Sequence, residues 1–157
     1  MWPLCGGPMT VSERQLPHII VRPSPRGRGV FARHALRAGE RLIEYKGERT
    51  DWDTAFSRLL AGEWHPGSAF LLGLRDGHVM VGTWERNPAR WINHSCEPNC
   101  EVEVHNSRAF ICTRGPIAAA KELTIDYALA ADMAPNHEVF KMFVCNCGAT
   151  ACRPTIP

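Results

Sequence analysis

Short apolar runs separated by glycine, proline and charged residues make up most of the hydrophobic pattern of this 157-residue chain. Runs of about four to eight residues that are rich in β-branched and aromatic side chains and bounded by turn residues are typical of β-strands. Asp76-Gly77 predicts a tight hairpin turn between two such runs, and Ala38-Gly39-Glu40 predicts another turn. The pattern predicts strands over residues 18–22, 29–32, 41–45, 69–74, 78–81, 100–104, 109–113 and 123–127.

Residues 50–62 show the spacing of a helix instead. Thr50 and Asp53 have the spacing of a capping box, in which the hydroxyl and the carboxylate cover backbone N–H groups at the start of a helix. Gly62 predicts that the helix ends at about Ala61. The apolar face of this predicted helix consists of Trp52, Ala55, Phe56, Leu59 and Leu60. The whole pattern therefore predicts a mostly β fold with short helices in a single domain.

Composition narrows the classes of function. The chain is 45% hydrophobic, which is enough for one core, and its formal net charge is only +2. We therefore expect no direct nucleic-acid binding, which would need a stripe of cations. The sequence has no apolar run of about 18 residues, so we expect no membrane-spanning helix. Residues 1–10 do not read as a secretory signal, so we expect a cytoplasmic protein. A nuclear, chromatin-associated or exported location and the oligomeric state remain open.

Seven cysteines are an odd number, which argues against a fully paired disulfide framework. Cys145, Cys147 and Cys152 crowd together near the C-terminus, and crowded thiols in a chain without a secretory signal are more often metal ligands. Structural zinc takes four protein ligands, so a fourth must come from elsewhere in the chain. Cys96 and Cys100 are both candidates for it. We interpret Cys5 and Cys112 as a free thiol and a small apolar core residue.

Four sequence blocks follow one another along the chain. They are residues 27–32 (GRGVFA), 93–99 (NHSCEPN), 122–127 (ELTIDY) and the cysteines of residues 145–152. In this order they resemble the SET-domain protein lysine methyltransferases that carry a cysteine-rich post-SET tail. The resemblance implies small curved sheets with a C-terminal pseudoknot, in which the end of the domain threads under an earlier loop. It also implies an N-terminal extension (1–17), a SET domain (18–130), a connecting segment (131–144) and a post-SET zinc-binding tail (145–157).

The resemblance implies transfer of a methyl group from S-adenosylmethionine to the side-chain amine of lysine in a protein substrate, such as a histone or another lysine-rich protein. Lysine has a pKa near 10.4, so only roughly one amine in a thousand is neutral at pH 7. The site must therefore offer an apolar slot that disfavours the ammonium, and oxygens that aim the lone pair. The alternative is a catalytically inactive SET-fold module that keeps the zinc. That reading predicts loss of Tyr127 or Asn93, and both are present.

The resemblance also implies roles for individual residues. Tyr127 and Tyr45 are the expected catalytic residues: the hydroxyl of Tyr127 points toward the methyl group and the amine, and Tyr45 orients the amine. Cys96 becomes the expected fourth zinc ligand, beside Cys145, Cys147 and Cys152. The expected cofactor-binding residues are Arg28, Gly29, Arg90, Asn93, His94, Tyr127 and Asn146.

The chain departs from the family pattern at several positions. Ile125 stands where the family usually has phenylalanine or tyrosine, the position associated with the number of methyl groups added. Because isoleucine is smaller and lacks a hydroxyl, we expect a roomier slot and di- or trimethyl product. A neighbouring Phe70, Phe140 or Phe143 could instead fill the space and restore a narrow slot. Phe70 itself replaces a common tyrosine, residues 81–83 (VGT) replace a more acidic sequence, and Pro154 follows the last cysteine block where an aromatic residue is common.

Overall fold

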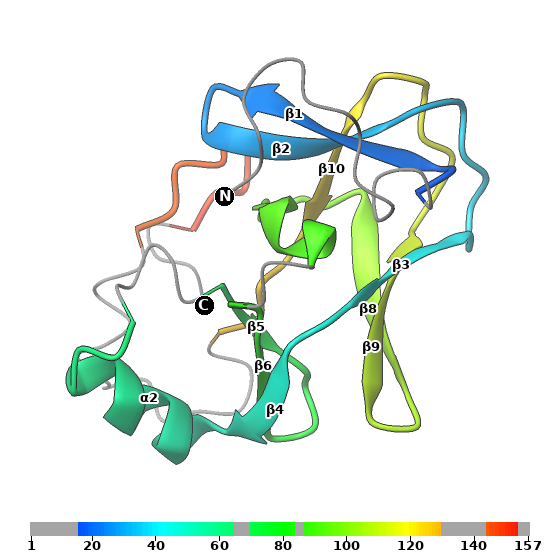
Figure 1. Ribbon diagram of the computed structural model, residues 1–157. Helices are drawn as coiled ribbons and strands as arrows, with labels where there is room; N and C mark the ends of the chain where they lie inside the picture. Colours follow the sequence, from blue (N-terminus) through cyan, green and yellow to red (C-terminus); the bar gives the residue numbers. More distant parts are fainter. Residues whose placement is uncertain (1–15, 65–69, 84–86, 130–143, 154–157) are drawn as a thin grey trace, which may run out of the picture.

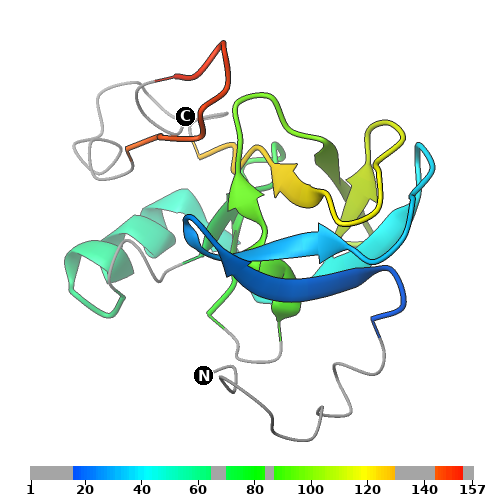
Figure 2. The same ribbon diagram turned by 90° about the horizontal axis from the view of Figure 1, so that it is seen from above.

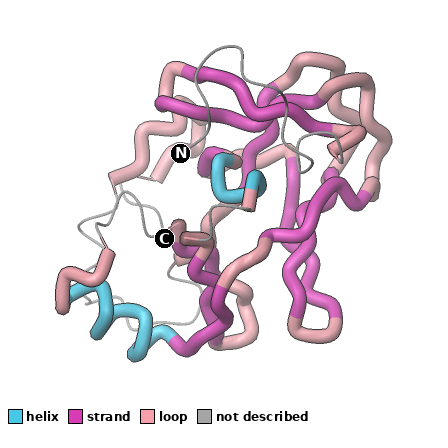
Figure 3. The backbone as a smooth tube through the Cα atoms, in the orientation of Figure 1, coloured by secondary structure: helices cyan, strands magenta, loops and turns pink. Residues whose placement is uncertain are grey.

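The computed structural model describes residues 16–64, 70–83, 87–129 and 144–153. Within these residues the chain forms three small β-sheets, one α-helix and one short 3-10 helix, η2 (Pro88–Trp91) (Figures 1 and 3). The mostly β fold predicted from the sequence is therefore confirmed. Among the described residues, no helix has the length and hydrophobicity needed to cross a membrane.

The first sheet brings together distant parts of the chain, in the order β1 (Ile19–Ser24), β2 (Gly27–Ala32), β10 (Glu122–Ile125) and β7 (Asn93–His94). Strands β1 and β2 form an antiparallel hairpin. Strand β10 then inserts between β2, to which it is antiparallel, and β7, to which it is parallel. The late strand is thus enclosed by two earlier parts of the chain, an arrangement in keeping with the C-terminal crossing of the SET fold. Figure 1 shows β10 below β2 near the centre of the molecule.

The other two sheets have three strands each. One has the order β3 (Arg41–Tyr45), β9 (Arg108–Thr113) and β8 (Cys100–His105), and the other has the order β4 (Glu48–Asp51), β6 (His78–Val81) and β5 (Leu71–Gly73). Seen from above, residues 144–153 lie at the periphery of the molecule beside the chain that follows β10 (Figure 2). The eight predicted strands agree with observed strands to within about two residues, although β10 ends at Ile125 and leaves Tyr127 outside the strand; β4 and β7 were not predicted.

The helix α2 (Trp52–Leu60) corrects two details of the sequence interpretation. Its N-cap is Asp51, whose carboxylate accepts a hydrogen bond from the Thr54 N–H at 2.8 Å, so the predicted capping box at Thr50 is wrong. Thr50 belongs to β4, where it pairs with Val79 of β6. Leu60 is 67% exposed and does not belong to the buried face, which consists of Trp52, Ala55, Phe56 and Leu59.

Two clusters of buried side chains hold the sheets together. The larger draws residues from all three sheets, and the smaller packs α2 against β5 and β6. Tyr127 packs against both clusters. Gly73 also contributes, because its backbone lies directly against the carbonyl of Ala128 and its N–H donates to the carbonyl of Tyr127 at 2.8 Å. A side chain at position 73 would push the β5 strand away from this segment. Tyr127 is therefore held both by the packing of its ring against the two clusters and by the hydrogen bond from Gly73 to its backbone.

Candidate active site and cysteine cluster

The parallel pairing of β7 and β10 creates the candidate site. It places Thr124 opposite Asn93 and Ile125 opposite His94, and the Ser95 N–H donates to the carbonyl of Ile125 at 2.9 Å. A cavity of about 270 Å³ opens beside this crossing. Its walls are Arg26, Asn93, His94, Tyr127 and residues 144–147. Four of the predicted cofactor-binding residues therefore share one cavity: Asn93, His94, Tyr127 and Asn146.

Asn93 is held by a polar network at one wall of the cavity. Its Nδ2 donates to the carbonyl of Arg28 at 2.8 Å and to Oε1 of Glu122 at 2.7 Å. Glu122 in turn packs over Gly29, where a Cβ would lie only 2.5 Å from the same oxygen. A side chain at position 29 would therefore displace the Glu122 carboxylate from this network, to which Arg28 contributes its main-chain carbonyl.

Arg26 is a cavity residue that the sequence interpretation missed. Its Nη1 donates to the carbonyl of His94 at 2.7 Å, and its Nη2 lies 3.7 Å from Oε2 of Glu122. The sequence signal that could have identified Arg26 was its position directly before Gly27, because the turn between β1 and β2 brings Arg26 to the cavity. The cavity therefore combines a guanidinium with backbone and side-chain oxygens, which suits a zwitterionic ligand.

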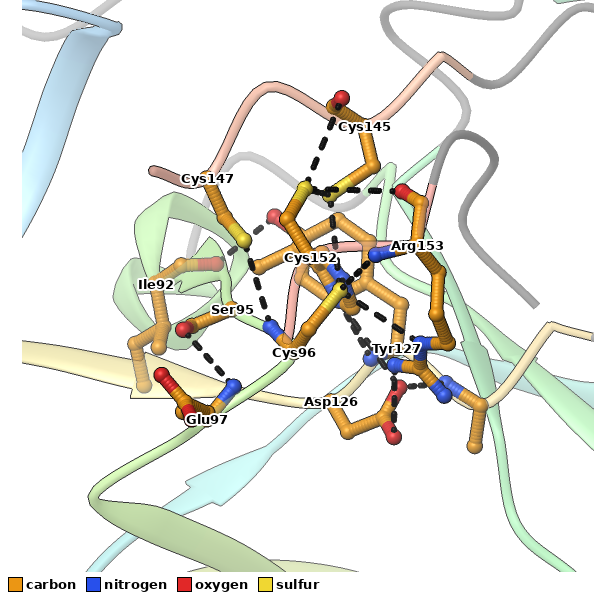
Figure 4. A network of polar contacts seen from close by, with 12 residues as sticks. Ile92, Ser95, Cys96, Glu97, Asp126, Tyr127, Cys145, Cys147, Cys152 and Arg153 are labelled. Atoms are coloured by element: carbon orange, nitrogen blue, oxygen red, sulfur yellow. Dashed lines mark hydrogen bonds and ion pairs between the residues drawn. The ribbon is translucent and has the colours of Figure 1, made fainter. Parts of the chain in front are cut away.

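Tyr127 is fixed at both its hydroxyl and its backbone. The hydroxyl donates to the carbonyl of Ile92 at 2.8 Å, and the backbone N–H donates to Nδ1 of His94 at 3.1 Å (Figure 4). Burial raises the pKa of Tyr127 to about 12, so the hydroxyl stays protonated in neutral solution. The side chain therefore presents a neutral hydroxyl in a fixed orientation.

Tyr45 is almost fully buried, and its hydroxyl donates to the carbonyl of Phe70 at 2.8 Å. Burial raises the pKa of Tyr45 well above its ordinary value, and the neighbouring Tyr127 adds to this shift. A Cβ at Gly82 would lie 2.5 Å from the Tyr45 hydroxyl, so glycine is needed at this position. The departure from the family pattern at residues 81–83 thus keeps the small residue that Tyr45 requires.

The guanidinium groups of Arg28 and Arg90 do not line the described cavity. Arg90 lies over the rings of Phe70 and Trp91, at 4.9 and 4.7 Å from their centroids, and its Nη1 donates to the carbonyl of Thr83 at 3.0 Å. Arg28 also lies over the ring of Trp91, 4.9 Å from its centroid. Contact of Arg90 with a cofactor stays a prediction.

The four cysteines of the predicted zinc site come together although Cys96 is far from the others in sequence. The sulfurs of Cys96, Cys145, Cys147 and Cys152 all lie within 4.8 Å of one another (Figure 4). The Cys145 sulfur lies 3.6 Å from both Cys96 and Cys152. A tetrahedral site with Zn–S bonds of about 2.3 Å places neighbouring sulfurs about 3.8 Å apart, so this donor set fits zinc.

Cys100, the competing candidate ligand, lies elsewhere. It is fully buried at the start of β8, and burial raises the pKa of its thiol to about 12. Cys112 on the neighbouring β9 is buried too, as expected for a small core residue. Cys5 lies outside the described residues. The structure therefore brings Cys96 to the cluster and leaves Cys100 in the core.

The protonation of the cluster is uneven. Backbone N–H groups of Cys96 and Ala149 lower the pKa of Cys147 to about 6, whereas burial raises the pKa of Cys145 to about 12. Thiolates are the form that binds a metal, so a bound cation would favour the deprotonated form of both Cys145 and Cys147.

His94 and Arg153 surround the sulfur of Cys96. Burial lowers the pKa of His94 to about 4, so its ring is neutral at pH 7. Because Nδ1 of His94 accepts from Tyr127, the ring proton is assigned to Nε2, which lies 3.4 Å from the Cys96 sulfur. Arg153, which the sequence interpretation also missed, donates to the same sulfur from its backbone N–H at 3.3 Å and from Nε at 3.4 Å.

The fold and this site together define a class of small β domain in which crossed segments and a cysteine-bearing tail line a shared cavity. A family profile for the SET domain matches residues 27–128, and the chain therefore belongs to the SET domain family. The four-cysteine cluster is consistent with the post-SET zinc site of this family.

Three relatives show the range of the similarity. The chain is 32% identical over 140 residues to "Histone-lysine N-methyltransferase ASHH1" of Arabidopsis thaliana, covering 85% of this chain and 27% of that protein. It is 33% identical over 139 residues to "Histone-lysine N-methyltransferase 2B" of Homo sapiens (85% and 5%). It is 30% identical over 151 residues to the H3 lysine-4 specific enzyme of Saccharomyces cerevisiae (91% and 13%). The chain thus corresponds to a minor part of the length of each.

Proposed function

We propose that this chain transfers a methyl group from S-adenosylmethionine to the side-chain amine of lysine in a protein substrate. One observation carries the proposal: the pairing of β7 with β10 places Asn93, His94 and Tyr127 on one cavity. Residues 144–147 of the cysteine-bearing tail line the same cavity. Residues 18–130 would form the catalytic domain and residues 145–157 the zinc-binding tail, with 1–17 as an N-terminal extension and 131–144 as a connecting segment.

The cavity fits the proposed cofactor by its chemistry. S-adenosylmethionine carries a carboxylate, an ammonium and an adenine, and it supplies an electrophilic methyl group when it is bound. Arg26 offers a guanidinium for the carboxylate, and the Asn93 side chain and the His94 main chain offer polar partners along the same wall. Asn146 adds a polar group from the tail, and the exposed Val144 provides an apolar cover.

The protein's part in the transfer is to orient the amine. The hydroxyl of Tyr127 stays protonated, and its position above the carbonyl of Ile92 sets the direction of approach. Tyr45 is held in the same way by the carbonyl of Phe70. Both ring nitrogens of His94 are used for structural contacts, so His94 does not serve as a base for the amine. The lysine proton would leave to solvent before the amine enters the slot, and correct alignment supplies the rate enhancement.

The cysteine cluster is proposed to hold one structural zinc ion through Cys96, Cys145, Cys147 and Cys152. Its role would be to fasten the tail against the cavity.

Because the relatives are named as histone-lysine methyltransferases, the proposed substrate class is histones or other lysine-rich proteins. The proposal is tested by incubating the purified chain with S-adenosylmethionine labelled in the methyl group and a mixture of core histones and other lysine-rich proteins. Absence of label in protein at any pH between about 7 and 9 would contradict it, since the neutral amine becomes more abundant as pH rises.

Ile125→Tyr is expected to shift the product toward monomethyl-lysine. Ile125 is fully buried in β10, opposite His94. The native chain should add two or three methyl groups, because the isoleucine leaves room for a methylated amine to rotate and react again. A tyrosine would narrow the slot and hold a water molecule beside the amine. The measurement is the intact mass of a peptide with a single lysine after long reaction times.

Ile125→Phe is the matched control, since it adds similar volume without the hydroxyl and should keep di- or trimethyl product. Enlarging a packed position costs about 1–3 kcal/mol, so the thermal stability of both variants is measured beside the product. Only monomethyl product from the native chain, even at long times, would show that the slot is already narrow and would remove this role of Ile125.

A further inference from the structure

The sulfur of Cys96 is the meeting point of three N–H groups. Two come from Arg153, the backbone N–H and Nε, and the third is Nε2 of His94. Arg153 continues beyond the sulfur, because its Nη2 donates to Oδ2 of Asp126 at 3.1 Å. One edge of the guanidinium thus touches a cluster sulfur and a carboxylate at the same time, as Figure 4 shows.

Asp126 is the residue directly before Tyr127, and its carboxylate shapes the chain there. Oδ1 accepts the N–H of Ala128 at 3.0 Å, which closes a local turn around Tyr127. Ala128 has a φ of +51°, a left-handed conformation that is uncommon outside glycine and that this hydrogen bond supports. The side chain of Asp126 is only 20% exposed. Its orientation therefore affects the direction in which the following residue points.

Cys96 is connected to the 126–127 dipeptide by two routes. Through His94 the sulfur is linked to the backbone N–H of Tyr127, and through Arg153 it is linked to the carboxylate of Asp126. A second cation, Arg75, lies 3.7 Å from the same carboxylate oxygen, but its side chain is 68% exposed and, among the described residues, forms no hydrogen bond to a cluster sulfur. Arg153 is therefore the cation that joins the two features.

We propose that Arg153 is a positioning residue through which the cysteine cluster fixes the orientation of Tyr127. This inference rests on the proposed methyltransferase function. The guanidinium is suited to the role because it offers two parallel donors on one rigid edge, one for the sulfur and one for the carboxylate. An ammonium on a flexible stem reaches one of these acceptors at a time. A lysine at position 153 would keep the charge and lose the connection.

The test compares Arg153→Ala and Arg153→Lys with Arg75→Ala, the matched removal of a cation beside Asp126. In zinc-saturated protein, both Arg153 variants are expected to lose about 10- to 100-fold in kcat, as is usual when an outer partner of a metal ligand is removed. The KM for S-adenosylmethionine should stay within about twofold, and zinc content should stay at one per chain. Arg75→Ala should keep native kcat within about twofold.

A second readout does not depend on turnover. With cobalt in place of zinc, the thiolate-to-metal charge-transfer bands report on hydrogen bonds to the ligand sulfurs. Loss of the Nε donor to Cys96 should shift these bands in both Arg153 variants and leave them in place in Arg75→Ala. If the native chain transfers no methyl group at all, the proposed function fails, and an unshifted spectrum in both Arg153 variants would separately overturn the connection.

Two other outcomes would also overturn the inference. One is native kcat in zinc-saturated Arg153→Ala. The other is a loss of activity in that variant that added zinc restores, because Arg153 would then only retain the metal. Should Arg153→Ala fail to fold, Arg153→Lys and Asp126→Asn decide the matter. Combining these two changes should cost no more kcat than the larger single effect, whereas independent, multiplying effects would contradict a shared connection.

Discussion

Tyr127→Phe is expected to reduce turnover by at least about 100-fold while the chain remains folded and binds S-adenosylmethionine with near-native affinity. The substitution removes only the hydroxyl, whose hydrogen bond to the carbonyl of Ile92 holds the ring in its present direction. The ring itself packs against both hydrophobic clusters and stays in place. The amine would then approach without the dipole that orients it, so kcat falls and the KM for the cofactor does not rise.

Steady-state kinetics, cofactor affinity by calorimetry and thermal unfolding are measured together on native protein and the variant. Loss of one buried hydrogen bond costs about 0.5–1.5 kcal/mol, so a modest fall in stability is compatible with the expectation. Unchanged turnover in a folded Tyr127→Phe variant would remove Tyr127 from the catalytic residues. Equal losses of turnover and of cofactor affinity would assign it to binding.

Cys96→Ser is expected to abolish stoichiometric zinc binding and, with it, most of the activity. Three thiolates from the tail cannot complete a tetrahedral site, and loss of a direct ligand should exceed the roughly 10- to 100-fold weakening that follows loss of an outer partner. The tail would then lose its connection, through Cys96, to the segment that follows β7 near its crossing with β10. Elemental analysis of protein dialysed against a weak chelator gives the zinc content per chain.

Cys100→Ala is the matched control for this change. Alanine is chosen because Cys100 is fully buried, and a hydroxyl there would lack a partner. The control should keep one zinc per chain and lose some thermal stability through the small cavity that it leaves. Zinc retained by Cys96→Ser but lost by Cys100→Ala would reverse the assignment of the fourth ligand. Active native protein without zinc would refute the metal site altogether.

Much of the strand content could be predicted from local patterns, because β-branched runs between glycine and proline turns need no distant partner to be recognised. The start of α2 could not be predicted from local patterns. Thr50 and Asp51 are both good capping residues, and the choice depends on the pairing of Thr50 with Val79 across two strands. Tertiary pairing therefore decided between two equivalent local signals.

The candidate site also depends on contacts between distant segments, which local sequence signals do not reveal. The resemblance pointed to Asn93, His94, Tyr127 and Asn146, and these do share one cavity. Arg26 and Arg153 had no signal of comparable strength, because their partners His94 and Cys96 lie 68 and 57 residues away in sequence. The choice between Cys96 and Cys100 likewise depends on β8, which carries Cys100 into the core. Such contacts arise from the crossing of distant segments and not from periodicity.

The measurement that tests the central claim most directly is a mass spectrum of tryptic peptides from a cell lysate treated with the purified chain and S-adenosylmethionine bearing a heavy methyl group. The account predicts heavy methyl groups on lysine side chains of one or a few proteins in the sample with native chain. It predicts none in a parallel sample with Tyr127→Phe at the same concentration. Heavy methyl groups confined to other residue types, equal labelling by both chains, or no labelling by native protein that holds zinc and binds the cofactor would contradict it.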